Sequence, residues 1–449
     1  MLAYKTPGVY VEEISTLPPS VAEVSTAIPA FLGHTEKAKK TIARVSTMLE
    51  YEEIFGGPST AEIKVTLADG ATPVVDVTAS TYVLYHALSH YFKNGGGACY
   101  IVSVGDYNDA LAAANFDEGL KRLEKEDEPT LVILTDAIGL SEADFHAACD
   151  ASLRHCHDLG DRFAILDVKT TADATNDAKK FRDGIGKNYL DYGAAYYPDL
   201  QTTLSHAYDE AEVEITDNRS VANGGSGNST PISLSTIRSS QTAVYQQIKK
   251  LIGAEQLVLP PSAAIAGVYA SVDRDRGVWK APANVSLAAV VGPTRKITNA
   301  EQDNLNVDPT GGKSINAIRA FTGIGTLAWG ARTLAGNDNE WRYVSVRRLF
   351  VMIEESTRKA SSFAVFEPND MSTWLKVRGA IESFLYGLWE RGALAGSTPE
   401  AAYYVKVGLG TTMTAQDILE GRMIIKIGIA AVRPAEFIVL QFSHKLQEA

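Results

Sequence analysis

Five side chains that commonly bind metals or act as nucleophiles fall in one short stretch of the sequence. They are His146, Cys149, His155, Cys156 and His157. Zinc sites usually place their cysteines only about two to four residues apart. Cys149 and Cys156 instead recur with Phe145, Ser152 and Leu159 at a helical spacing, which puts both thiols on an apolar stripe. The pattern therefore predicts two cysteines in a packed core and histidines in solvent, rather than a metal site.

Two glycine-rich segments resemble phosphate-binding loops. Thr310–Ser314 reads TGGKS, but the phosphate loop requires an earlier glycine at the position held by Val307. Gly95–Gly97 precedes a predicted strand, whereas the dinucleotide-binding fingerprint follows one. We therefore interpret Thr310–Ser314 as an ordinary turn and Gly95–Gly97 as a helix stop.

The remaining candidates for catalysis are charged pairs. No G-x-S-x-G nucleophile elbow occurs. Asp273 with Asp275, and Glu354 with Glu355, fit a solvated face better than a catalytic dyad. Arginines gather in the second half of this acidic chain, at Arg274, Arg276, Arg332, Arg342, Arg347 and Arg348. Two interpretations stand equally: carboxylate binders on a contact surface, or ion pairs within the chain to those same acidic residues.

Composition narrows the class of protein. The chain has 449 residues, of which 45% are hydrophobic and 21% charged, and a net charge of −12. This balance predicts a globular protein of two or three domains, and the acidity argues against nucleic-acid binding. Charges break every apolar run before the ~18 residues that a membrane helix needs, and MLAYKTPGVYVEEIS lacks the regions of a secretory signal. Three cysteines suit a reducing cytoplasm.

The elements that position these residues alternate between strand and helix in the first half. Strands are predicted at 24–33, 98–104, 131–135, 163–168 and 192–197, helices at 81–93, 110–126, 141–160 and 174–185, and a hairpin at 62–67 and 73–77 around Asp69-Gly70. Uninterrupted apolar strands spaced by helices predict a mostly parallel sheet covered on both faces. Further helices are predicted at 235–251, 345–361 and 373–391, and a strand at 403–409; residues 218–230 read as a polar loop.

Both ends of the chain carry strand-forming segments. Met423, Ile425, Ile427 and Ile429 are apolar at a period of two, with Arg422 and Lys426 on the other parity, and a second apolar run spans 437–442. At the other end, a short strand at 9–14 is followed by Pro18-Pro19, which favours an extended linker. Unpaired apolar strands promote aggregation, so each should pair with its own chain or with a neighbour.

Several long blocks resemble the contractile tail sheath family, which includes phage tail sheaths and the sheaths of phage-tail-like extracellular contractile injection systems. The blocks read YKTPGVYVEE, LPPSAAIAGVYASVDRDRGVWKAPAN, LNVDPTGGKSINAIRAFTGIGTLAWGARTL, EWRYVSVRRLFVMIEESTRKASSFAVFEPND and FIVLQFSHKLQEA. They cover both termini and nearly all of residues 255–449, whereas residues 60–250 match more loosely. The length is closer to an injection-system sheath than to a large phage sheath.

The resemblance implies an α/β fold with four parts. Residues 1–24 and 430–449 would be linking arms, 25–59 with 255–429 a common inner α+β domain, and 60–254 an inserted outer α/β domain. The arms would complete the mixed sheet of neighbouring subunits. Stacked rings of six subunits would surround an inner tube and drive it forward on contraction. The implied partners are other copies, the inner tube, and baseplate and cap proteins. Neither a cofactor nor membrane insertion is implied, and synthesis in the cytoplasm would precede incorporation into a tail-like particle.

Three sets of residues follow from this interpretation. Val9, Tyr10, Val11 and Ile14 are expected to form one exchanged strand, and Phe437, Val439, Leu440 and Phe442 another. Met423, Ile425 and Ile427 are expected in the sheet that receives them. Arg347, Arg348, Arg358 and Lys359 form a basic cluster that would hold an acidic inner tube. The alternatives are an α/β enzyme of unknown substrate, based on residues 80–200, and a binding module whose swapped arms close into rings.

Overall fold

The computed structural model describes residues 21–437, apart from 38, 172, 221, 222, 224 and 226–230. The chain divides into two compact units. The large unit comprises Ser25–Met352 with Arg433–Ala449, and the small unit comprises Met1–Val24 with Ile353–Val432. Helix α10 (Val344–Ala360) begins in the sequence of the large unit and ends in that of the small unit.

A nine-stranded sheet forms the centre of the large unit. From one edge to the other its strands are β13 (Val285–Ser286), β16 (Gly325–Ala328), β15 (Ile315–Phe321), β8 (Gly193–Tyr197), β7 (Phe163–Asp167), β6 (Leu131–Leu134), β1 (Pro29–Thr35), β5 (Cys99–Asp106) and β2 (Ile42–Val45). The six strands from β15 to β5 are parallel, and β2, β16 and β13 are antiparallel to their neighbours. The predicted α/β class is confirmed.

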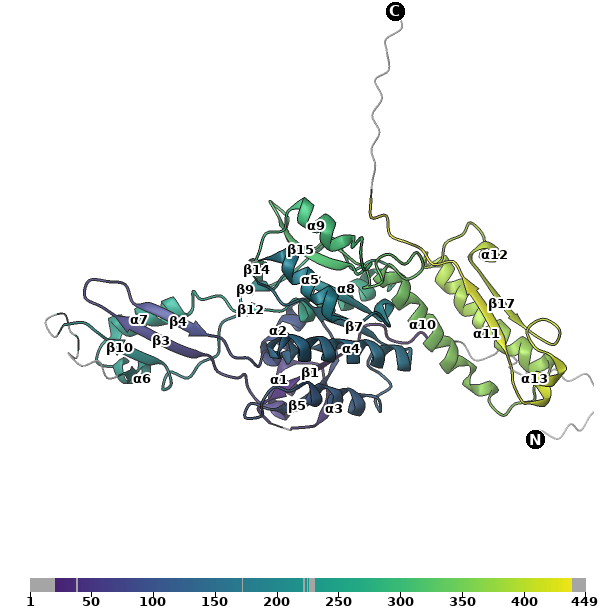
Figure 1. Ribbon diagram of the computed structural model, residues 1–449. Coiled ribbons are helices and arrows are strands. Elements are labelled where there is room, and N and C mark those ends of the chain that lie inside the picture. The colour runs from purple at the N-terminus through teal and green to yellow at the C-terminus, as the bar shows by residue number, and fades with distance from the viewer. Residues whose placement is uncertain are drawn as a thin grey trace, which may run out of the picture. The chain divides into compact units, whose positions relative to one another are not determined.

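Helices cover both faces of this sheet, as Figure 1 shows. One face packs against α3 (Ala113–Leu123), α4 (Glu142–Leu159), α5 (Ala174–Gly184) and α9 (Asn299–Asn306). The other packs against α1 (Met48–Phe55), α2 (Leu84–Lys93) and α8 (Ser262–Arg276). Alternation along β1 explains the two cores, because Ala30 and Leu32 enter the first whereas Phe31 enters the second. The uninterrupted apolar runs of the sequence are thus strands buried on two sides.

Two smaller sheets complete the large unit. One is β11 (Ile232–Ser233), β10 (Glu214–Asp217), β3 (Glu62–Leu67) and β4 (Val74–Thr78), packed against α6 (Leu234–Ile237) and α7 (Thr242–Ile252). The other is β12 (Val258–Leu259), β9 (Leu200–Thr202) and β14 (Val290–Pro293). The predicted hairpin is confirmed by β3 and β4. The single helix predicted at 235–251 is wrong, since it breaks at Ser239-Ser240, where serine side chains compete for backbone groups.

The small unit contains a long helix and a two-stranded sheet. Helix α11 (Met371–Glu390) lies along β17 (Tyr403–Val407), which pairs antiparallel with β18 (Ile425–Ile429) (Figure 1). Short helices α12 (Pro399–Ala402) and α13 (Ala415–Leu419) flank the strands. Asp370 caps α11 by accepting a hydrogen bond from the Thr373 amide at 3.0 Å.

The unit boundaries differ from the predicted division at residues 60 and 254. β1, from the predicted inner segment, lies between β5 and β6 from the predicted outer segment. β15 and β8 also pair across the predicted boundary. Parallel neighbours need long crossover connections, so distance in sequence does not reveal which strands share a ladder. Which surfaces face inward or outward in an assembly stays a prediction.

Candidate assembly interface

The two-stranded sheet of the small unit has an incompletely covered apolar side. Val405 of β17 is buried beneath its neighbours, and its partner across the ladder is Ile427. Ile425, Ile427 and Ile429 of β18 are only half-buried. In the part of the chain that the structure describes, neither strand has a further neighbour in its sheet. An isolated pair of strands is marginally stable in water, so this sheet has room and reason to accept more strands.

The opposite side of the same sheet faces solvent and carries a distinctive set of residues. The Tyr404 ring covers Gly428, where a Cβ atom would lie 2.2 Å from a ring carbon, so that a larger residue would displace the ring. Lys406 lies directly across the ladder from Lys426, and its Nζ atom is 5.0 Å from the centre of the Tyr404 ring. Both lysines are exposed. This face therefore presents an aromatic ring beside two positive charges.

An arginine–carboxylate pair holds the chain where it leaves the N-terminal segment. Arg348 donates to the Asp273 carboxylate at 2.5 and 3.1 Å and to the Thr26 carbonyl at 2.8 Å. The Thr26 hydroxyl donates to the same carboxylate at 2.5 Å. Both charged side chains are nearly buried, and the guanidinium lies 4.6 Å from the Tyr269 ring centre. Residue 26 is thus fixed to the large unit by a charge-assisted network.

A second pair holds the start of the predicted C-terminal arm. Arg332 donates from Nε to both oxygens of Glu436 at 2.9 and 3.1 Å, and from Nη2 to Oε2 at 2.6 Å. Asn306 and Tyr343 donate to the same carboxylate at 2.8 and 3.1 Å. Burial acts to raise the pKa of Glu436, but the hydrogen bonds from Arg332 and Asn306 outweigh it and lower the pKa.

The structure describes only some of the residues that are predicted to take part in strand exchange. Val9, Tyr10, Val11, Ile14, Val439, Leu440 and Phe442 lie outside the described residues. Phe437 is the last described residue and is 72% exposed. Ile425 and Ile427 lie in β18, whereas Met423 precedes the strand. The participation of these residues in strand exchange stays a prediction.

The predicted basic cluster is divided by the structure. Arg347 is buried, lying 4.1 Å from the Tyr192 ring centre, and Arg348 is buried against Asp273. Arg358 and Lys359 have exposed side chains that pair with Glu355 at 2.7 and 3.1 Å. For Arg348 and Arg274 the ion pairs with Asp273 and Asp275 are those that the second interpretation expected. A tube contact is retained as a prediction for Arg358 and Lys359, because a buried guanidinium presents no surface to a partner.

The histidine and cysteine cluster lies on α4 and is mostly internal. Cys149 and Cys156 are buried, as predicted, and burial raises the pKa of both thiols. The prediction of a solvated His155 is wrong. Its Nε2 atom accepts a hydrogen bond from Arg162 at 3.0 Å, and burial, reinforced by the charge of Arg162, lowers its pKa to about 4. Among the described residues no group of three or more such side chains is placed to hold a metal ion.

The positions where α/β proteins bind ligands are filled by the chain's own carboxylates. Ligands usually bind at the carboxyl ends of the strands, often at a helix N-terminus. Asp136, just after β6, accepts from the amides of Val83 and Leu84 at the start of α2, at 2.7 and 3.1 Å. Asp167 at the end of β7 accepts from the amide and hydroxyl of Ser262 at the start of α8, at 2.8 and 2.6 Å. These helix starts are capped internally.

Gly33 in β1 permits the first of these caps. A Cβ atom at this position would lie 2.9 Å from an oxygen of Asp136 and 2.9 Å from the Leu84 side chain. The close approach of strand, carboxylate and helix therefore excludes any larger residue at position 33.

The TGGKS segment is also satisfied internally. Asp308 accepts from the amides of Thr310 and Gly311 at 3.1 and 3.0 Å, which are groups that a bound phosphate would need. Lys313 is buried and donates to the carbonyl of Ile185 at 2.7 Å. The turn predicted here is confirmed.

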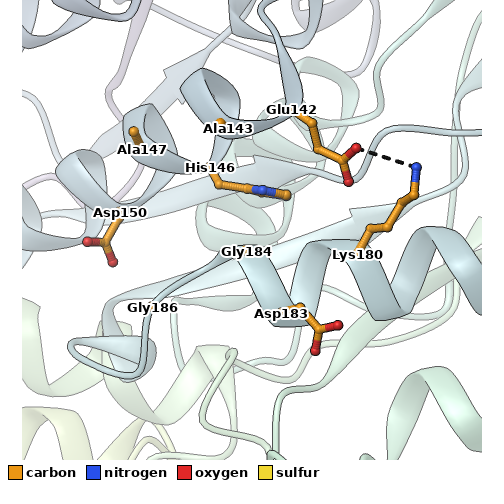
Figure 2. A pocket seen from close by; sticks show the side chains of 9 residues that line it. All are labelled: Glu142, Ala143, His146, Ala147, Asp150, Lys180, Asp183, Gly184 and Gly186. Atoms are coloured by element: carbon orange, nitrogen blue, oxygen red, sulfur yellow. Dashed lines mark hydrogen bonds and ion pairs between the residues drawn. The ribbon is translucent and has the colours of Figure 1, made fainter.

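A groove of about 710 Å³ lies between α4 and α5, and Figure 2 shows the side chains around it. Glu142 and Lys180 pair across it at 3.4 Å. His146 packs against the backbone of Gly184, and burial lowers the pKa of its imidazole. Within the described chain, this groove is a polar gap between two helices, with no nucleophile and base in contact.

Sequence reasoning missed the Arg332–Glu436 pair and the lysine pair, and it gave Asp273 only as one of four possible partners for Arg348. Arg332 and Glu436 are 104 residues apart, and Arg348 and Asp273 are 75 apart, so no local pattern links them. The lysines carried a usable signal, since pairing the strand predicted at 403–409 with the one at 423–429 would place Lys406 near Lys426. No helix in the described residues is long and apolar enough to cross a membrane.

Comparison with known proteins agrees with this architecture. Residues 336–445 match the phage tail sheath C-terminal domain. The PVC sheath complex of an extracellular contractile injection system, in its contracted state, is 33% identical with a TM-score of 0.70, and the match covers 100% of this chain and 99% of that one. The contracted helical sheath of the anti-feeding prophage (AFP) is 32% identical with a TM-score of 0.67, covering 99% of this chain and 100% of that one.

Curated relatives match over shorter stretches. The tail sheath protein of Enterobacteria phage T4 is 24% identical over 188 residues, which are 41% of this chain and 27% of the relative. That of Vibrio phage KVP40 is 25% identical over 139 residues, or 30% of this chain and 20% of the relative. The matches thus span about a quarter of these relatives' length or less. The chain belongs to the contractile tail sheath family, whose members are structural proteins and not enzymes.

Proposed function

We propose that copies of this chain polymerise as stacked rings around an inner tube and contract to drive the tube through a target envelope. The observation that carries the proposal is the two-stranded β17–β18 sheet, whose strands have no further partner among the described residues. Apolar strand-forming runs at both ends of the sequence supply the missing strands. The similar structures include contracted sheaths and an AFP baseplate, which supports self-assembly and attachment to a baseplate.

Strand addition gives this assembly its geometry. A donated strand that carries Val9, Tyr10, Val11 and Ile14, and another that carries Phe437, Val439, Leu440 and Phe442, add to a neighbour's sheet next to Ile425 and Ile427. Each contact joins two different surfaces, so the contacts do not close on themselves and generate a filament. Backbone hydrogen bonds supply affinity, and alternate side chains supply specificity.

Contraction then moves subunits largely as rigid bodies while the strand links persist. The segments 16–20 and 430–435 act as joints. The ion pair Arg348–Asp273 supports the first of these joints, because Arg348 also donates to the Thr26 carbonyl and so fixes residue 26, which follows segment 16–20, to the large unit. The free energy comes from surface buried on contraction, so no cofactor or fuel is required.

The remaining assignments concern the surroundings of the sheath. Residues 25–59 and 255–429 supply the surface toward the inner tube and residues 60–254 the outer surface, although strands of both sets share the central sheet. Arg358 with Lys359 contacts an acidic tube surface. Cap proteins close the ends. The exposure of Arg358, at 64% of its side chain, supports this contact. The protein is made in the cytoplasm and becomes part of a phage-tail-like particle.

Deletion of residues 1–15 tests the proposal. The truncated chain is expected to stay folded by circular dichroism and to form no long sheaths with the inner tube protein in electron micrographs. Val11→Pro should have the same effect, because proline cannot donate a hydrogen bond to a ladder, whereas the matched Val11→Thr should assemble. Normal sheaths from the truncated chain would contradict the proposal.

A further inference from the structure

We propose that Lys406 and Lys426 form the recognition site for Glu12 in the N-terminal strand of a second copy of this chain. This inference rests on the strand exchange proposed above. It adds a specific ionic contact, a choice between the two arms, and a register for the donated strand.

The first argument is the unfavourable pairing of the two lysines. Lys406 and Lys426 are directly opposed in the antiparallel ladder, on its exposed face. Like charges at such positions, with Cβ atoms about 5 Å apart, destabilise a sheet. Neither lysine has an ion pair with any residue that the structure describes. The folded subunit alone gives no reason for this arrangement, whereas a carboxylate placed beside it would be attracted by both charges.

The second argument is the match between two strand patterns. In β17 the exposed positions are Tyr404 and Lys406, separated by a buried Val405. In the N-terminal run, Tyr10 and Glu12 are separated by Val11 in the same way. Since alternate side chains share a face, a donated strand with Val9 and Val11 toward the apolar side directs Tyr10 and Glu12 toward solvent. One register then places Tyr10 level with Tyr404, and Glu12 level with the lysines.

The third argument distinguishes the two arms. The C-terminal run Phe437–Phe442 contains no acidic residue, whereas the N-terminal run contains Glu12 and Glu13. Of these two, only Glu12 shares a face with Tyr10. Charge complementarity therefore assigns the lysine pair to the N-terminal strand. The same lysines repel the equivalent sheet of another subunit, which discourages edge-to-edge association between two acceptor sheets.

Complementary charge reversal tests the inference in the full-length chain. Glu12→Lys alone, and Lys406→Glu with Lys426→Glu, should each raise the critical concentration for sheath growth by roughly three- to tenfold, as expected for a reversed cross-strand charge pair. A mixture of the two variants should restore growth, because each variant's arm then matches the other's sheet. Lys376→Glu, the same charge change at an exposed position of α11, is the matched control and should assemble normally.

Each outcome of the charge-reversal experiment either supports or overturns the proposed contact between Glu12 and the two lysines. Rescue in the mixture supports recognition between copies. Rescue only when all three substitutions are in one chain would mean that the arm binds its own sheet, and it would overturn the inference. The inference would also be overturned if each variant, assembled alone, had the same critical concentration for sheath growth as the wild type. If the charge variants assemble but deletion of residues 1–15 does not, strand exchange survives and only the ionic recognition fails.

Discussion

Arg332 and Glu436 are joined by a two-pronged ion pair, although 104 residues separate them in the chain. The arginine side chain is 5% exposed and the glutamate 22% exposed. Because Glu436 lies within the predicted C-terminal arm, directly before the apolar run 437–442, this pair fixes the point at which that run leaves the large unit. Load carried by the arm would pass through this carboxylate.

Arg332→Ala is expected to destabilise the subunit by about 2–3 kcal/mol, because it leaves a partly buried carboxylate without its counter-charge. Thermal or denaturant unfolding measures the change. Glu436→Gln should cost less, since an amide retains some hydrogen bonds to Asn306 and Tyr343. Because the folded state lowers the pKa of Glu436, the stability from its ionised form is present above the ordinary glutamate pKa of about 4.3 and is lost as the pH falls through the lowered value. If the free energy of unfolding of Glu436→Gln fell with decreasing pH in the same way as that of the wild type, this account would be contradicted.

Arg348→Ala should be the more damaging change, by about 3–5 kcal/mol, since both partners of this pair are nearly buried. Loss of the guanidinium also removes the hydrogen bond to the Thr26 carbonyl. Arg274→Ala is the control: Arg274 and Asp275 pair at the surface, where an ion pair contributes about 1 kcal/mol at most. Equal losses from the two variants would show that the buried network does not stabilise the subunit.

Asp167→Asn should stabilise the subunit at neutral pH. Burial raises the pKa of Asp167 to about 7, despite the hydrogen bonds from Ser262. The unfolded chain releases this proton near pH 3.9, so the contribution of Asp167 to wild-type stability falls as the pH rises from there to about 7 and is constant above. The asparagine variant lacks this loss. Unfolding experiments should show it gaining roughly 2–4 kcal/mol on the wild type between about pH 4.5 and pH 7.5. A pH-independent difference would count against a buried neutral carboxyl.

Reversing the charges of Arg358 and Lys359 should weaken co-assembly with the inner tube. Their side chains are 64% and 42% exposed, so both can reach a partner. Because exposed charges are screened by salt, the defect should be largest at low ionic strength. Lys376→Glu again serves as the control. Normal co-assembly of Arg358→Glu/Lys359→Glu at physiological salt would remove the proposed tube contact.

The local sequence pattern predicted where the strands lie in the chain better than it predicted which strands are adjacent in the sheet. β6 and β7 are uninterrupted apolar runs between helices, and the sequence placed both to within two residues. It did not predict that β1 would lie between β5 and β6, because parallel pairing is decided by packing over long separations. α4 shows the same limit, since helical spacing identified its buried cysteines but not Arg162, whose contact buries His155.

The candidate assembly interface was also predicted only in part, for the same reason. Alternating isoleucines predicted β18, yet nothing in the sequence near Glu436 indicated its partner Arg332. Arg347 and Arg348 resembled a contact surface because a run of arginines shows charge but not burial. The structure assigns them internal partners.

A reconstruction of the assembled sheath by electron cryomicroscopy, at a resolution that separates β-strands, tests strand exchange most directly. The account predicts that the sheet containing Tyr403–Val407 and Ile425–Ile429 gains strands from other copies, one of them formed by residues 9–14 with Glu12 beside Lys406 and Lys426. A sheet that stays two-stranded in the sheath, or that is completed only by its own chain, would contradict it.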